Sequence, residues 1–173
     1  KFRLFKKIFI NIGDDQSIEN DLSSFSSHLK YIKDIMSNCN SDSLVLIDEI
    51  CNGTDPKLGG ALSASILKYL SEVDCISIVT THIGDLKSFA FNTEKIENAS
   101  LEFDIETLSP NYKFVVGVPG QSFTFEIAKK FEFPDNTLNF AKSLLDEDEN
   151  NLEDLIKELN FNKQKYLELK RDF

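Results

Sequence analysis

Two hydrophobic periods alternate along the first half of the chain. Short apolar runs occur within residues 1–12, 43–49 and 75–80, flanked by polar and glycine positions, and this pattern is typical of strands. Over 21–38 and 56–70, apolar residues instead recur at helical spacing. Strand, helix and strand in this order predict an α/β fold in which right-handed crossovers join parallel strands.

The second apolar run ends in two adjacent carboxylates, Asp48 and Glu49. A run this short predicts a strand buried on both faces, as in a parallel sheet. Ligands of open α/β sheets bind beyond the carboxyl ends of the strands, so both acids stand where chemistry takes place. This is the Walker B arrangement, in which the first acid holds Mg²⁺ and the second polarises an attacking water. Taken alone, the pattern fits a strand ending in solvated acids equally well.

The third apolar run ends at His82. Since parallel strands end at the same edge of a sheet, we expect His82 to lie at the same sheet edge as Glu49. There it could hydrogen-bond a γ-phosphate or the attacking water. A single histidine is more often a surface or core residue with an ordinary hydrogen-bond partner.

Two helix beginnings carry further chemistry. Ser23 and Ser24 open the helix over 21–38, and hydroxyls and free N–H groups at a helix start form an anion site. Simple capping by Asp21 or Ser23 is the alternative and the more frequent explanation. Asp55, just before a proline, predicts the cap of the next helix.

The second half of the chain predicts a short helix over 84–91, an antiparallel strand pair at 99–105 and 112–118 with a turn at 109–111, and further helices up to residue 145. The acidic run from residue 146 predicts a solvated linker. Beyond it, apolar residues follow a heptad pattern, which predicts either the start of a coiled coil or a helix packed on the domain. We therefore expect one domain over 1–145 and a linker with a helical tail over 146–173. The heptad positions are Leu152, Leu155, Leu159, Tyr166 and Leu169.

Composition narrows the class of protein. The 173 residues, 41% of them hydrophobic, suit one ordinary domain or part of a larger one, and the missing initial Met favours a fragment. A net charge of −10 argues against nucleic-acid gripping by this segment. The three cysteines form no CxxC pair, which favours a reducing cytoplasm, and no apolar run approaches the ~20 residues of a membrane span.

Several segments in order resemble the MutS family of ABC-type ATPases, in its bacterial type-two branch. The DP pair in the second segment is the feature that points to that branch. The segments are IGDDQSIE (12–19) followed by LSSFSSHL (22–29), LVLIDE (44–49) with GTDP (53–56), TTH (80–82) with LK (86–87), and NASLEFD (98–104) with the glycines and proline of 117–120.

The resemblance implies a P-loop NTPase sheet flanked by helices, with ATP and Mg²⁺ as cofactors. It assigns Asp48 to Mg²⁺, Glu49 to the general base or water orienter, and His82 to a switch that senses the γ-phosphate. It also implies a homodimer in which Ser23 and Ser24 reach the nucleotide of the partner subunit, while Asp55 belongs to a loop coupling the two sites. Double-stranded or branched DNA, or stalled ribosomes, would bind through other domains.

Departures from the family pattern qualify this picture. The family usually has small residues where Cys51 and Asn52 stand, and a helix-ending glycine where Glu132 stands. No GxxxxGK[ST] phosphate loop occurs in the sequence, so we expect the chain to begin inside the ATPase domain, downstream of that loop. The alternative is a non-catalytic dimerisation or interaction module with a degenerate ATPase fold.

Overall fold

The chain folds into two compact units, Lys1–Ile96 and Glu97–Phe173. The computed structural model describes residues 3–12, 21–104, 107, 109–145, 155, 156, 158 and 162, with the backbone alone at 21–24 and 110.

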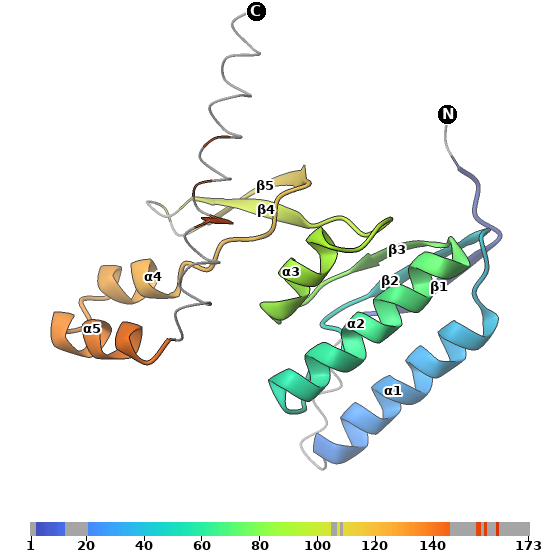
Figure 1. The fold of residues 1–173 in the computed structure, drawn as a ribbon, viewed down its shortest axis with the longest axis horizontal. Coiled ribbons are helices and arrows are strands. Elements are labelled where there is room, and N and C mark those ends of the chain that lie inside the picture. Colours follow the sequence, from blue (N-terminus) through green and yellow to red (C-terminus); the bar gives the residue numbers. More distant parts are fainter. Residues whose placement is uncertain are drawn as a thin grey trace, which may run out of the picture. The chain divides into compact units, whose positions relative to one another are not determined.

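Unit 1 is built on a parallel sheet. Its order, β1-β2-β3, puts the strand with the two terminal carboxylates in the middle. The helices α1 and α2 form the crossovers between the strands, and α3 follows β3 (Figure 1). The predicted α/β class and parallel pairing are thereby confirmed. The elements are β1 Lys7–Asn11, α1 Asp21–Asn38, β2 Ser43–Ile47, α2 Pro56–Val73, β3 Ile76–Val79 and α3 Asp85–Phe91.

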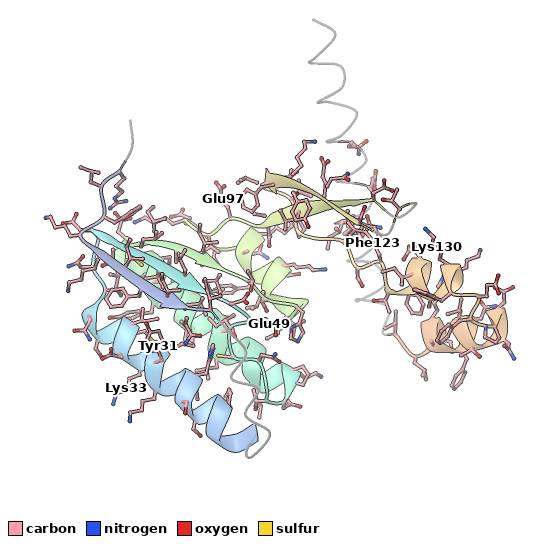
Figure 2. The ribbon with its side chains drawn as sticks, turned by 180° about the vertical axis from the view of Figure 1, so that it is seen from behind. Tyr31, Lys33, Glu49, Glu97, Phe123 and Lys130 are labelled. Carbon is pink, nitrogen blue, oxygen red and sulfur yellow. The ribbon has the colours of Figure 1, made fainter. Side chains whose placement is uncertain are left out.

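The core of unit 1 lies between the sheet and the two long helices. Both α1 and α2 lie on the same side of the sheet, as Figures 1 and 2 show from opposite directions. Val45 and Ile47 of β2 are buried against these helices, whereas Leu44 and Leu46 alternate with them and are only half-buried. The prediction of a strand buried on both faces is therefore wrong, because both helices cover one face. The core residues of the helices are Ile32, Ile35, Ile66 and Leu70.

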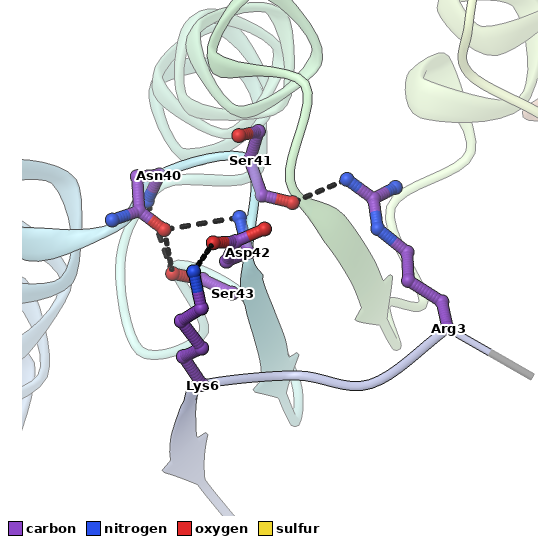
Figure 3. Close-up of polar contacts among 6 residues, drawn as sticks. All are labelled: Arg3, Lys6, Asn40, Ser41, Asp42 and Ser43. Atoms are coloured by element: carbon purple, nitrogen blue, oxygen red, sulfur yellow. Dashed lines mark hydrogen bonds and ion pairs between the residues drawn. The ribbon is translucent and has the colours of Figure 1, made fainter.

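Polar contacts fix the loop between α1 and β2 at the amino edge of the sheet (Figure 3). The Asn40 side chain accepts hydrogen bonds from the Asp42 amide at 3.0 Å and the Ser43 hydroxyl at 3.1 Å. Lys6, just before β1, pairs with Asp42 at 2.7 Å and lowers the pKa of that carboxyl by hydrogen bonding and charge. Arg3 donates to the Ser41 carbonyl. These contacts hold the start of β1 beside the start of β2.

The start of α2 forms as predicted. Asp55 is its N-cap, with one carboxylate oxygen accepting from the amides of Lys57 and Leu58 at 3.0 Å each. Pro56 follows as the first helical residue, where its lack of an N–H costs nothing. The helix ends at Asp74, which takes a left-handed backbone with φ 62°.

The three cysteines are free thiols. Burial raises the pKa of Cys75 to about 11, so it stays a neutral thiol at physiological pH. Among the described residues, no helix combines the length and the apolar character that crossing a bilayer requires.

Unit 2 begins with an antiparallel pair, β4 Ala99–Asp104 and β5 Ser109–Val116. The pairing is as predicted, but the turn at 109–111 is wrong: those residues lie in β5, and Ser109 pairs with Asp104. Pro110 misled the prediction, because a proline is tolerated on an edge strand and both strands of a pair are edges.

Two short helices follow, α4 Thr124–Lys130 and α5 Asp135–Ser143. Between them Glu132 has φ 59°, the left-handed backbone that suits the helix-ending glycine usual at this position in the family. Farther on, Leu155 and Ile156 are helical, the first 62% and the second 2% exposed. The rest of the heptad pattern and the acidic run from residue 146 lie outside the described residues, so the boundary at 145 stays a prediction.

Candidate functional site

The two acids follow the central strand at the carboxyl edge of the sheet, and both side chains are exposed. The amide of Asp48 donates to the Asn11 carbonyl at 2.8 Å, which carries the β1–β2 ladder one residue beyond β2. Glu49, labelled in Figure 2, follows Asp48 and has a left-handed backbone with φ 47°. A non-glycine residue adopts this conformation only where its surroundings hold it there.

Thr80, the first residue after β3, contacts the whole segment 47–50. Its amide donates to the Ile47 carbonyl at 2.9 Å, and its carbonyl accepts from the Ile50 amide at 3.1 Å. Its side-chain oxygen accepts from the Glu49 amide at 2.9 Å and donates to a carboxylate oxygen of Asp48. A hydroxyl has one proton, so accepting from Glu49 leaves that proton for Asp48.

Asn52 holds the other end of Glu49. Its side-chain amide donates to the Glu49 carboxylate, and its side-chain oxygen accepts from the Gly53 amide at 2.8 Å. The Asn52 amide also donates to the Glu49 carbonyl at 3.1 Å, which closes the turn. Glu49 is thus fixed by its backbone on one side and its side chain on the other.

The first turns of α2 pack against the backbone of this turn. A Cβ atom on Gly59 would lie 3.1 Å from the Cys51 carbonyl oxygen, so only glycine allows this approach without a shift. Ser63, fully buried, donates to the Gly59 carbonyl at 2.7 Å and lies 3.4 Å from the Ile50 carbonyl oxygen.

The helix α1 reaches the same turn through His28. The amide of Cys51, a residue with φ 55° and 2% exposure, donates to Nε2 of His28 at 3.3 Å. Burial lowers the pKa of His28, which favours the neutral ring that such an acceptor requires. Strands β1 and β3 and helices α1 and α2 therefore all hold the segment 47–53.

The predicted site residues are brought together in part. His82 is exposed two residues beyond Thr80, so the expectation that it shares the sheet edge with Glu49 is confirmed by the parallel register. Ser23 and Ser24 lie in the first turn of α1, but their side chains are outside the described residues. Asp55 uses its carboxylate to cap α2.

Three residues of the site have no role in the sequence analysis: Thr80, Asn52 and His28. Thr80 could have been found from strand alignment, because Ile47 pairs with Val79 and the next positions are Asp48 and Thr80. Asn52 stands out only as a departure from the family pattern. Nothing local to His28 in the sequence marks it, since its partner lies 23 residues away.

The donor set of the site suits a hard cation bound mainly by phosphates and water. Within the described ranges, no three His, Cys, Asp or Glu residues gather closely enough to hold a metal ion by themselves. Mg²⁺ in phosphate-transfer sites usually takes only one or two carboxylates, with waters and phosphate oxygens completing its shell. The exposed carboxylate of Asp48, oriented by a hydroxyl, fits that requirement.

Comparisons with known proteins match nearly the whole chain. A family model described as MutS domain V matches residues 1–149. Endonuclease MutS2 of Alkaliphilus metalliredigens is 46% identical over 164 residues, 95% of this chain and 21% of that protein. Endonuclease MutS2 of Staphylococcus aureus is 45% identical over 159 residues, 92% of this chain and 22% of that protein. The protein of the same name from Fusobacterium nucleatum is 40% identical over 173 residues, 100% of this chain and 22% of that protein. The chain spans about a fifth of the length of these curated relatives.

Proposed function

The chain belongs to the MutS family, in its MutS2-type branch, and from this premise we propose that it is part of a P-loop ATPase domain that hydrolyses ATP. One observation carries the proposal: two adjacent acids stand at the carboxyl end of the central strand, and Thr80, the first residue after the neighbouring strand, binds the Asp48 carboxylate and the Glu49 amide. Open α/β sheets bind ligands at this edge. A structural turn would have little need to hold two exposed acids so firmly.

In this proposal Glu49 accepts the proton of the attacking water or orients it, and Asp48 contributes a ligand to Mg²⁺. The cation, when bound, neutralises charge on the phosphate oxygens. His82, exposed at the same edge, donates a hydrogen bond to the γ-phosphate or the water. Phosphoryl transfer depends mainly on positioning and charge stabilisation, and fixed side chains meet that demand.

Hydrolysis in this proposal requires two copies of the domain. Ser23 and Ser24 lie in the first turn of an 18-residue helix, whose positive end favours a phosphate of the partner's nucleotide. Asp55 lies between the turn that follows Glu49 and helix α2, and would transmit the state of one nucleotide site to the other.

The activity would serve a larger protein. We propose that it controls the binding of double-stranded or branched DNA, or of stalled ribosomes, through other parts of a cytoplasmic MutS2-type protein. The net charge of −10 agrees with phosphate-backbone contacts lying outside this chain.

Replacement of Glu49 by Gln in the intact protein tests the proposal. We expect Mg²⁺-dependent ATP hydrolysis to fall by about 10²–10⁴-fold, the usual contribution of general base catalysis, while ATP binding is retained. Glu72→Gln, an exposed change on α2 that removes only the ion pair with Lys68, is the matched control. An unchanged rate in the Glu49 variant excludes Glu49 as the activating residue. If the unaltered protein neither binds nor hydrolyses ATP, the alternative of a non-catalytic dimerisation or interaction module is correct.

A further inference from the structure

We propose that Thr80 is a positioning residue whose single hydroxyl group orients the Asp48 carboxylate and anchors the backbone of Glu49. The inference rests on the contacts of that hydroxyl and goes beyond the roles given to Asp48, Glu49 and His82. For its activity readout it also rests on the proposed function.

The direction of each hydrogen bond follows from chemistry. An amide N–H can only donate, so the Thr80 oxygen is the acceptor in its 2.9 Å contact with Glu49. The one hydroxyl proton is then directed to the Asp48 carboxylate. The same atom therefore orients the Asp48 carboxylate and anchors the Glu49 backbone.

The hydrogen bond from the Glu49 amide to the Thr80 hydroxyl stabilises the unusual backbone conformation of Glu49. In a regular parallel ladder the Thr80 carbonyl would accept from the Glu49 amide, but here it accepts from the Ile50 amide at 3.1 Å, and Glu49 turns away from the strand with φ 47°. The Thr80 hydroxyl takes the place of a backbone carbonyl as the partner of that amide. Since Asn52 holds the Glu49 carboxylate, loss of the Thr80 hydroxyl would release the backbone end of a side chain held at two points.

Thr80→Val and Thr80→Ser form a matched pair. Valine keeps the size and branching of threonine without the hydroxyl, whereas serine keeps the hydroxyl without the methyl group. In the intact protein we expect valine to lower kcat for ATP hydrolysis by about 10- to 100-fold, the range seen when a partner of a metal ligand is lost. Serine should restore the rate to within about threefold. Thr93→Val, which removes a hydroxyl donating to the Phe89 carbonyl at the end of α3, is the control for hydroxyl loss elsewhere in unit 1.

A second readout does not depend on activity. Amide hydrogen exchange of the segment 48–51, measured without nucleotide, should be faster in Thr80→Val and unchanged in Thr80→Ser. Exchange within α1 reports whether the variant is folded. Unchanged exchange in the valine variant, or equal loss of activity in the valine and serine variants, would overturn the role of the hydroxyl. A wild-type protein without ATP hydrolysis would overturn the proposed function and leave the exchange result to decide on Thr80.

Discussion

Glu132 lies at a backbone position that favours glycine, and its replacement should stabilise the protein. The residue follows α4 and has φ 59°. Its amide donates to the Lys129 carbonyl at 3.0 Å, and the next amide, of Phe133, donates to the Ala128 carbonyl at 3.1 Å. These two bonds form a Schellman motif, with Glu132 at the left-handed position that glycine usually occupies.

The size of the effect follows from two terms. A left-handed backbone costs a residue with a Cβ roughly 1–2 kcal/mol, and replacement by glycine recovers this cost. Glycine is also freer in the unfolded chain, which offsets roughly 0.5–1 kcal/mol of the recovered stability. Glu132 also places a negative charge beside the carbonyl end of α4, which costs about 0.3–1 kcal/mol at an exposed site. Glu132→Gly should therefore raise the free energy of unfolding by about 1 kcal/mol.

Two further variants distinguish the contribution of the left-handed backbone from that of the negative charge. Glu132→Gln removes the charge and keeps the Cβ, so we expect it to recover only the smaller electrostatic part. Lys129→Gly introduces glycine inside the same helix, where it should cost about 1 kcal/mol. Chemical denaturation followed by circular dichroism measures all three. If Glu132→Gly is no more stable than Glu132→Gln, the strain of the left-handed backbone does not exceed the added freedom of glycine in the unfolded chain, and the prediction is wrong.

Two further predictions concern the turn and the helix beside it. Burial lowers the pKa of His28, so the unfolded chain binds its proton more readily; stability should therefore decrease as the pH falls below about 6.5. Glutamine at position 28 cannot be protonated but still offers an acceptor to the Cys51 amide. Denaturation at pH 7 and 5.5 should therefore show a smaller decrease in the free energy of unfolding for His28→Gln than for the wild type. Equal decreases in the two proteins would refute this. Asp55→Ala should cost about 0.5–2 kcal/mol because two amides of α2 lose their acceptor, whereas Asp55→Asn keeps it and should stay within a few tenths of the wild type. Equal losses in the two Asp55 variants, measured by denaturation, would mean that the cap itself is not the source.

The elements of unit 1 could be predicted because their signals are local. Helical periodicity predicts 21–38, the bounds found for α1, and the Asp55-Pro56 pair marks the start of α2. The two failures are of another kind. The burial of Leu44 and Leu46 depends on which faces of the sheet are covered, and the turn between β4 and β5 depends on pairing that Pro110 does not prevent. A residue's own type contains neither piece of information.

The amino-acid pattern predicts the order of strands and helices, the carboxylates at the end of β2 and, through resemblance to the MutS family, the chemistry to expect of them. It does not predict how these carboxylates are held, because that depends on the fold. The hydroxyl of Thr80 reaches Glu49 across 31 residues, and the ring of His28 reaches Cys51 across 23. Such partners are chosen by parallel strand register and by helix packing, which bring distant residues together through contacts that no local pattern encodes.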